Sequence, residues 1–311
     1  MGIYAYVTHE SSRYINIYSV NADGTLTDTG NTTVTAHAVT GIAIKNNFVY
    51  ITCWYANVII MYSVNPDGTL TDAGYTIATG SGPIDIDFNN NFAYVVNRHA
   101  NVITMYSVNT DGTLTAIVGA TTPVDNPSGI AFKNNFAYVT NTYNNTVTIF
   151  SVNADGTLTA TGNTNVTEAV PFDIDIKNNF AYVANLYSST VAIYSVNADG
   201  TLTAIAGDTT PVYDPAGIAF NNNFAYITNY SINTVTIFSV NADGTLTDTG
   251  NTAATGNTPI GIAFNIYNIS ASASAPISGP ITAPPPLSVP TQVKIPSSSN
   301  MSLGLKVQYI K

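Results

Sequence analysis

Charge, cysteine and long hydrophobic runs are all scarce in this sequence of 311 residues. Only 8% of the residues are charged, where about a quarter is usual, so the surface must be polar without being ionic. The single cysteine, Cys53, excludes an intrachain disulfide framework and a multi-cysteine zinc site. No run of about 18 apolar residues occurs, and the start lacks the basic and apolar regions of a secretory signal, so we expect no membrane insertion.

Positive charge is especially rare, because 8 Lys and Arg stand against 18 Asp and Glu, for a net charge of −10. Such a chain cannot present the basic stripe that phosphate backbones require, so we expect no nucleic acid as a partner. The low-charge composition, rich in Asn and Thr, favours an extracellular or cell-surface location. The absence of a visible signal peptide leaves a cytoplasmic location open.

The sequence does contain an internal repeat. Six repeats fill residues 3–260, and the 20 Tyr and 12 Phe of the chain supply enough apolar surface for a large core. A repeat of 40 to 45 residues is typical of a propeller blade. The motif SVNADGTLT or a close variant recurs at a constant step of 44 residues, with its aspartate at Asp23, Asp67, Asp111, Asp155, Asp199 and Asp243.

Each full repeat holds four short segments in which Val, Ile and Tyr alternate with Thr, Ala and Ser, which predicts four strands. The Asp-Gly pair is typical of a hairpin turn. The first repeat begins at Ile3 without its first strand, whereas a spare GIAFN follows the sixth repeat at residues 261–265. We therefore predict an all-β, six-bladed β-propeller of four-stranded antiparallel blades, closed by this C-terminal strand, which completes blade 1.

Two segments resemble a known repeat. FAYVTN at residues 136–141 and FAYITN at residues 224–229, each followed by a Thr-Val-Thr strand, are similar to the YVTN-type repeat of the YncE-like and lactonase-like β-propellers. The resemblance covers about residues 3–265 and implies a propeller, although members of this group more often have seven blades. For function it implies hydrolysis of a sugar lactone, with an acid–base set drawn from His9, Glu10, Arg13 and His99.

The composition changes after Ser270 to a stretch rich in Pro, Ser and Ala. We therefore predict a propeller domain over residues 1–270 and a Pro/Ser-rich tail over residues 271–311. Residues 302–311 regain the alternation of a strand. This segment either docks on the outer edge of a blade, which allows self-association, or is a disordered extension.

The loops of each repeat differ on one face only. The loops after strands 1 and 3 repeat the same turns, whereas those after strands 2 and 4 vary and carry nearly all the rare residue types; we call their side the variable face. Variable loops on a rigid scaffold are the usual place for binding. The predicted binding residues are Glu10, Arg13, His37, Cys53, Trp54, Tyr55, Arg98, His99, Tyr143, Tyr187 and Tyr230.

Two adjacent repeats replace the Asn of the YVTN motif, with His9 in the first and Cys53 in the second. A His-Cys pair suggests either a nucleophile with its base or a soft metal site. The alternative, which we favour, is that both residues replace an Asn that caps a turn. Trp54 and Tyr55 are then exposed aromatic anchors for a partner.

A longer repeat of 88 residues relates 85–172 to 173–260, and it places Asp85, Asp87, Asp173 and Asp175 where the other repeats read GIA. These carboxylates on the innermost strands either hold a cation such as Ca²⁺ or accept hydrogen bonds from backbone N–H groups and Thr hydroxyls. We favour the second interpretation and predict neither a metal nor a cofactor.

Three functions remain open. The favoured one is a non-catalytic binding scaffold for a protein or carbohydrate ligand, because aromatic, Asn- and Thr-rich loops offer stacking and neutral hydrogen bonds. The alternatives are a lactonase-like hydrolase and a self-assembling subunit that uses its C-terminal strand. We expect no hydrolase turnover from His9, Glu10 or His99, because loops of different blades should point separately toward solvent.

Overall fold

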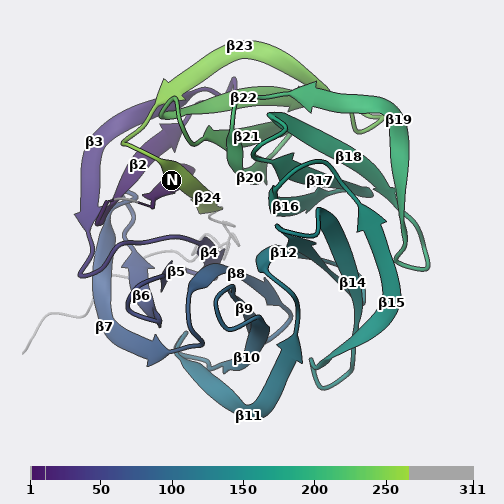
Figure 1. Ribbon diagram of the computed structural model, residues 1–311. Helices are drawn as coiled ribbons and strands as arrows, with labels where there is room; N and C mark the ends of the chain where they lie inside the picture. The colour runs from purple at the N-terminus through teal and green to yellow at the C-terminus, as the bar shows by residue number, and fades with distance from the viewer. Residues whose placement is uncertain (1, 11, 266–311) are drawn as a thin grey trace, which may run out of the picture. The chain divides into compact units, whose positions relative to one another are not determined.

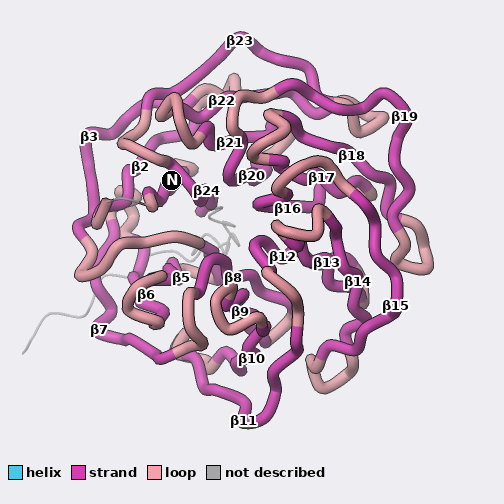
Figure 2. Tube along the Cα trace, viewed as in Figure 1, coloured by secondary structure: helices cyan, strands magenta, loops and turns pink. Residues whose placement is uncertain are grey.

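The alternating segments form 24 strands in six antiparallel sheets around a central axis (Figure 1). The structure is a computed structural model, and it describes residues 2–10 and 12–265. These residues form strands and loops only (Figure 2), so the described part of the chain has no helix long and apolar enough to cross a membrane. The predicted six-bladed β-propeller is confirmed.

Blade 1 combines strands from both ends of the described chain, and blades 2 and 3 follow it in chain order. Blade 1 consists of β24 (Pro259–Asn265), β1 (Tyr4–His9), β2 (Tyr14–Val20) and β3 (Leu26–Val34). Blade 2 consists of β4 (Ile42–Lys45), β5 (Phe48–Cys53), β6 (Val58–Val64) and β7 (Leu70–Ala78). Blade 3 consists of β8 (Pro83–Asn89), β9 (Phe92–Asn97), β10 (Val102–Val108) and β11 (Leu114–Pro123).

The last three blades follow in chain order. Blade 4 consists of β12 (Pro127–Lys133), β13 (Phe136–Asn141), β14 (Thr146–Val152) and β15 (Leu158–Val166). Blade 5 consists of β16 (Pro171–Lys177), β17 (Phe180–Asn185), β18 (Thr190–Val196) and β19 (Leu202–Pro211). Blade 6 consists of β20 (Pro215–Asn221), β21 (Phe224–Asn229), β22 (Thr234–Val240) and β23 (Leu246–Ala254).

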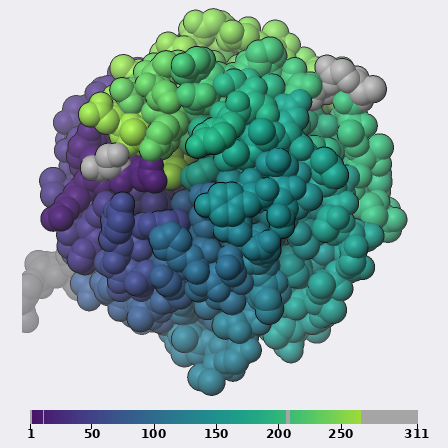
Figure 3. Space-filling model, viewed as in Figure 1, coloured from purple at the N-terminus to yellow at the C-terminus, as the bar shows by residue number. Residues whose placement is uncertain are grey.

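Blade 1 closes the ring with strands from opposite ends of the described chain. β24 pairs antiparallel with β1, and the register sets Tyr4 opposite Asn265 and Val7 opposite Ile262. The purple and yellow-green segments are therefore adjacent in Figures 1 and 3. The predicted closure is confirmed, and it covers the inner edge that β1 would otherwise expose.

The hydrophobic core lies between blades. Five of the six buried clusters draw their residues from two neighbouring blades; one of them packs Val7 of blade 1 against Tyr226 and Ile237 of blade 6. A single blade cannot bury both faces of its sheet, so the stability of each blade depends on its neighbours.

A tyrosine on the second strand of every blade ties that blade to the next. The Tyr226 hydroxyl of blade 6 donates to the Gly24 carbonyl oxygen of blade 1 at 2.8 Å. Gly24 has a φ of +83°, and a Cβ there would lie 2.6 Å from the Phe224 ring, so only glycine fits. The same bond joins Tyr6 to Gly68, Tyr50 to Gly112, Tyr94 to Gly156, Tyr138 to Gly200 and Tyr182 to Gly244.

The uniform face is built from tight turns. In the first Asp-Gly turn the Asp23 carboxylate accepts hydrogen bonds from the Thr25 hydroxyl at 2.7 Å and the Thr25 N–H at 3.0 Å, and these bonds lower the pKa of Asp23. The same pair of bonds recurs at the other five aspartates of the motif. These repeated aspartates therefore serve the turns.

The predicted tail, residues 271–311 with its strand at 302–311, lies outside the described residues. The domain boundary at residue 270 and docking by this strand remain predictions.

Candidate functional site

Loops of the variable face enclose a pocket of about 290 Å³, which we call the outer pocket. Blade 1 and blade 3 each contribute one charged side chain to it, the loop between blades 5 and 6 contributes a third, and the other lining residues belong to blades 5 and 6 and the loops before them. The lining residues are Glu10, Arg98, Val170, Phe172, Leu186, Tyr187, Asp214, Tyr230 and Ser231.

Glu10 and Tyr230 meet across the seam of the ring. Glu10 directly follows β1, and its backbone N–H donates to the carbonyl oxygen of Thr258 at 3.1 Å, which fixes the start of this loop. The Tyr230 hydroxyl donates to Glu10 Oε2. Burial, and then the bond to Glu10 and its negative charge, raise the pKa of Tyr230, so this phenol stays protonated and orients the carboxylate.

Arg98 brings a positive charge into the same pocket. It directly follows β9, and its guanidinium carbon lies 5.6 Å from the centroid of the Phe172 ring and 5.9 Å from that of Tyr143. Burial lowers the pKa of Arg98, while the phenol of Tyr143 and the carboxylate of Glu10 oppose the change. A guanidinium remains charged at neutral pH, so two aromatic rings hold a fixed cation in the outer pocket.

Phe172 is a pocket residue that our sequence prediction missed. It is the second residue of β16, where the other blades carry Thr40, Ile84, Ser128, Ala216 and Ile260. Its ring lies against Arg98 and also lines a small cavity in the throat of the channel below. The signal was present in the repeat alignment, because Phe172 is the only aromatic residue at that position.

The remaining aromatic candidates lie on the loops after strand 2, on the same face. Trp54 and His99 stack edge to face, with ring centroids 4.4 Å apart, and Trp54 is partly buried. Tyr55 is 80% exposed and Tyr143 is 73% exposed. Tyr187 both lines the outer pocket and remains largely exposed.

His9 and Cys53 are buried at the ends of β1 and β5. His9 Nε2 lies 2.7 Å from Asn16 Oδ1, and Nδ1 lies 3.2 Å from the Asn257 carbonyl oxygen. Burial lowers the pKa of His9 and raises the pKa of Cys53 to about 12. A neutral thiol of this kind is a poor nucleophile, which argues against a nucleophile at Cys53.

Two further candidates stay apart from the pocket. Arg13 and His37 are exposed, and neither lines the outer pocket. The expectation that His9, Glu10 and His99 point separately toward solvent fails for Glu10, which shares one pocket with Arg98, and for His9, which is buried. His99 is exposed and does not line the outer pocket. Glu10 and Arg98 hold the same position in their repeats, and Leu186 and Tyr230, at that position in blades 5 and 6, also line the outer pocket.

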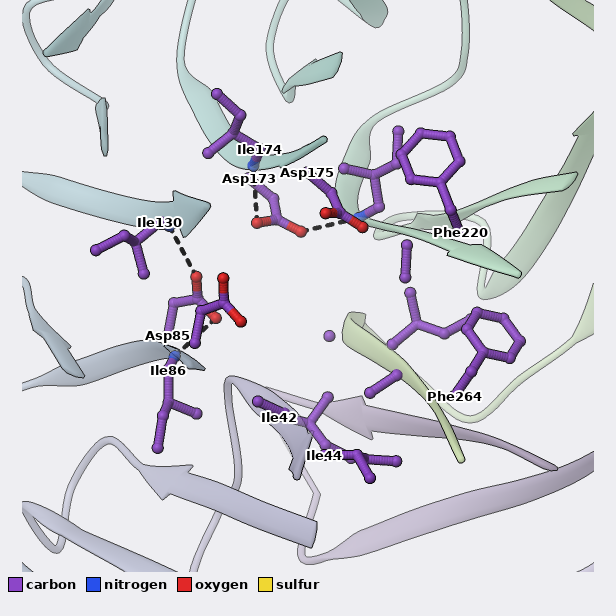
Figure 4. A pocket seen from close by; sticks show the side chains of 17 residues that line it. Ile42, Ile44, Asp85, Ile86, Ile130, Asp173, Ile174, Asp175, Phe220 and Phe264 are labelled. Atoms are coloured by element: carbon purple, nitrogen blue, oxygen red, sulfur yellow. Dashed lines mark hydrogen bonds between the residues drawn. The ribbon is translucent and has the colours of Figure 1, made fainter. Parts of the chain in front are cut away.

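The four aspartates line a second cavity, of about 220 Å³, in the central channel. Asp85 accepts hydrogen bonds from Ile86 N at 2.8 Å and from Ile130 N of blade 4 at 2.9 Å. Asp173 accepts the equivalent bonds from Ile174 N and Ile218 N (Figure 4). These two carboxylates therefore join blade 3 to blade 4 and blade 5 to blade 6.

Glycine stands at the same position in the blades between them. A Cβ on Gly41 would lie 2.6 Å from Asp85 Cα, and one on Gly129 would lie 2.8 Å from Asp173 Cα. From blade 3 to blade 6, interfaces joined by a carboxylate therefore alternate with an interface where the glycine allows close backbone approach. Within residues 2–10 and 12–265, no group of three or more His, Cys, Asp or Glu is arranged to hold a metal ion.

Comparison with known proteins adds a family. Residues 1–132 and 120–220 match the family model "Lactonase, 7-bladed beta-propeller". No curated protein matches the chain. A candidate 6-phosphogluconolactonase from Bacteroides fragilis is similar in structure, with a TM-score of 0.65 and 17% identity, over 85% of this chain and 98% of that chain.

Two other solved structures share the fold. The periplasmic gluconolactonase of Pseudomonas aeruginosa has a TM-score of 0.65 and 14% identity, over 84% of this chain and 99% of that chain. A chain of the nidogen–laminin complex has a TM-score of 0.62 and 14% identity, over 85% of this chain and 99% of that chain. The family match spans well over half of the sequence, so the chain belongs to the lactonase seven-bladed β-propeller family, whose fold it builds with six blades.

Proposed function

We propose that this protein hydrolyses an uncharged sugar lactone in the outer pocket. The observation that carries the proposal is the convergence of Glu10 and Arg98, from blades 1 and 3, on one pocket of a chain of the lactonase family. Ester hydrolysis needs a base for water and a cation or donor for the developing oxyanion, and these two side chains supply both.

In the proposed reaction, the Glu10 carboxylate takes a proton from water while the water oxygen forms a bond to the lactone carbonyl carbon. The negative charge that develops on the carbonyl oxygen faces the Arg98 guanidinium. The ring C–O bond then breaks, and its oxygen takes the proton from the Glu10 carboxylic acid, which leaves the open-chain hydroxy acid. Tyr230 is a positioning residue here, because its hydroxyl holds Oε2 of Glu10 in place.

The charge of the outer pocket supports a substrate without phosphate. Its ionisable side chains at neutral pH are Arg98, Glu10 and Asp214, which together carry one net negative charge. A phosphate dianion would meet one cation and two carboxylates, and repulsion in a partly enclosed pocket is costly. A neutral lactone avoids that repulsion.

The test is hydrolysis of glucono-1,5-lactone followed by pH-stat. We expect Glu10→Gln and Arg98→Ala each to lower kcat/KM by about 100-fold or more, in line with the loss of one base or one oxyanion partner. Arg13→Ala is the matched control, since it removes a charge from the loop of Glu10 but outside the outer pocket, and it should leave kcat/KM unchanged.

Two results would contradict the proposal. One is wild-type turnover that equals the uncatalysed rate for a panel of sugar lactones. The other is turnover that both pocket variants retain. Binding of an intact ligand without turnover would instead support a non-catalytic binding scaffold.

A further inference from the structure

The exposed aromatic residues of the propeller gather on one face. Four tyrosines are exposed among the described residues, and all four lie on loops after strand 2 or strand 4, on the variable face: Tyr55, Tyr143, Tyr187 and Tyr213. The repeated tyrosines of the strands are buried. Exposed aromatic rings that gather on one face usually mark a binding surface.

Three of these tyrosines occupy one position of the repeat. Tyr55, Tyr143 and Tyr187 are each the second residue after strand 2 in blades 2, 4 and 5, and we call them the tyrosine rim. Each follows a residue of the inner position, the position that Glu10 and Arg98 hold in blades 1 and 3. The rim therefore adjoins the side chains of the outer pocket, and Tyr187 itself lines that pocket.

Contacts connect the tyrosine rim to the outer pocket. The Tyr143 ring lies 5.9 Å from the guanidinium carbon of Arg98, and Tyr187 lines the pocket directly. Tyr55, which is 80% exposed, holds the equivalent position in blade 2. A ligand bound at Glu10 and Arg98 that extends outward would meet these rings first.

The size of the outer pocket limits how much of a ligand it can hold. Its volume of about 290 Å³ is at the lower end of the range of about 300–1,000 Å³ that is usual for small-molecule sites. It therefore suits a single sugar ring, and any further ring would lie against the tyrosine rim.

We propose that the natural substrate is an oligosaccharide aldonolactone, whose lactone ring enters the outer pocket while the attached sugar ring stacks on the tyrosine rim. This inference rests on the proposed function and names its substrate class. Tyrosine offers the C–H face of a sugar a flat apolar surface and offers its hydroxyls a hydrogen-bond partner. Asn144 and Ser188, each next to a rim tyrosine in sequence, add neutral polar groups that suit an uncharged glycan.

The experiment compares the kcat/KM values of two lactones, glucono-1,5-lactone and the lactone of cellobionic acid. We expect the disaccharide lactone to be preferred by about 10-fold or more. Tyr55→Ala and Tyr143→Ala should each reduce this preference by about 3- to 10-fold, which is the usual effect of losing one stacked ring. Tyr55→Phe and Tyr143→Phe should restore most of it, because they keep the stacking surface.

Val118→Ala is the control, because Val118 is fully exposed on β11 and does not line the outer pocket; it should leave both values unchanged. Equal kcat/KM values for the two lactones, or a preference that survives Tyr55→Ala and Tyr143→Ala, would overturn the inference.

A failure of the proposed function gives a different result. If neither lactone is hydrolysed, the hydrolase is refuted, and calorimetric titration with cellobionate and gluconate then tests the tyrosine rim alone. Tighter binding of cellobionate that Tyr55→Ala abolishes would support the glycan surface. Equal binding of the two acids, or no binding of either, would refute it.

Discussion

The carboxylates of the channel should make the propeller less stable as the pH rises. Burial raises the pKa of Asp87 to about 7, with a further contribution from the negative charge of Asp173 and an opposing one from Lys45. Burial likewise raises the pKa of Asp173 to about 7. The pKa values of Asp85 and Asp175 are raised well above the ordinary range of a carboxyl group, again chiefly by burial and then by the negative charges of the other carboxylates of the channel.

The sign follows from the folded and unfolded states. Asp87 has a pKa of about 7 when folded against 3.8 in the ordinary carboxyl, so the folded protein binds this proton more tightly. Its contribution to stability is complete below about pH 4 and is lost as the pH rises through about 7. Full ionisation of a completely buried group with this pKa would cost about 4 kcal/mol. Because Asp87 is partly accessible from the channel, we expect its ionisation to lower the free energy of unfolding by only about 1–2 kcal/mol.

The variant that tests this is Asp87→Asn. The amide oxygen can still accept the hydrogen bond from the Phe88 N–H, at 2.7 Å in the wild type, while the charge is gone. We expect the free energy of unfolding to rise by about 1–2 kcal/mol at about pH 8, and to change by less than about 0.5 kcal/mol at about pH 4, where the wild-type carboxyl is already neutral. Urea denaturation at a series of pH values measures both.

Asp23→Asn serves as a control of opposite sign. Hydrogen bonds from Thr25 lower the pKa of Asp23, so this carboxylate stabilises the fold above the ordinary carboxyl pKa, and that stability is lost as the pH falls. Asp23→Asn should therefore lower stability at about pH 8. The reasoning about the channel is refuted if Asp87→Asn gives no gain at high pH, or an equal gain at low and high pH.

Two further predictions concern the scaffold and the cysteine. Gly24→Ala should destabilise the protein by more than about 2 kcal/mol, because its Cβ would overlap the Phe224 ring; Gly30→Ala, with a positive φ but nothing within 4 Å, should cost only about 1 kcal/mol in the same thermal unfolding assay. Burial of the Cys53 thiol, with its pKa raised to about 12, should make alkylation by iodoacetamide slow in the native protein and fast in urea, and equal rates would contradict its burial.

The architecture was predictable because each repeat carries its own local signals. The Asp-Gly turns and the alternation of apolar residues set the strands, and a constant step of 44 residues set the blade. Closure was predictable from a missing strand before Ile3 and a spare one at residues 261–265, since an unpaired inner edge must find a partner.

The contacts between blades were less accessible from the sequence. Nothing in the motif shows that the hydroxyl of Tyr226 reaches Gly24, because that bond joins residues 202 positions apart. The role of Asp85 is similar: its residue type indicated a polar partner, but only the register of two neighbouring blades identifies the Ile130 N–H. Such bonds depend on how far each blade is rotated from the next, which local patterns do not encode.

The candidate site was predictable in part. The sequence did not show which of the loop side chains point into the outer pocket. The sequence placed Glu10, Arg98 and Tyr230 on the variable face, but it also grouped them with Arg13 and His37, which lie outside the outer pocket. Arg13, three positions beyond Glu10 in the same loop, is exposed and does not line the pocket. The useful signal was the position within the repeat, because equivalent residues of four blades, among them Glu10, Arg98 and Tyr230, line the outer pocket.

Six blades in a family described by seven also change how site residues must be assigned. When a ring has one blade fewer, a residue keeps its position within its own repeat but acquires a different partner across the axis. Glu10 of blade 1 meets Tyr230 of blade 6 through the seam, and it shares the outer pocket with Arg98 of blade 3. Residue roles therefore cannot be transferred from a seven-bladed relative by counting blades. They follow from which side chains reach the axis together, and in this ring that criterion selects the carboxylate and the guanidinium that the proposed hydrolysis requires.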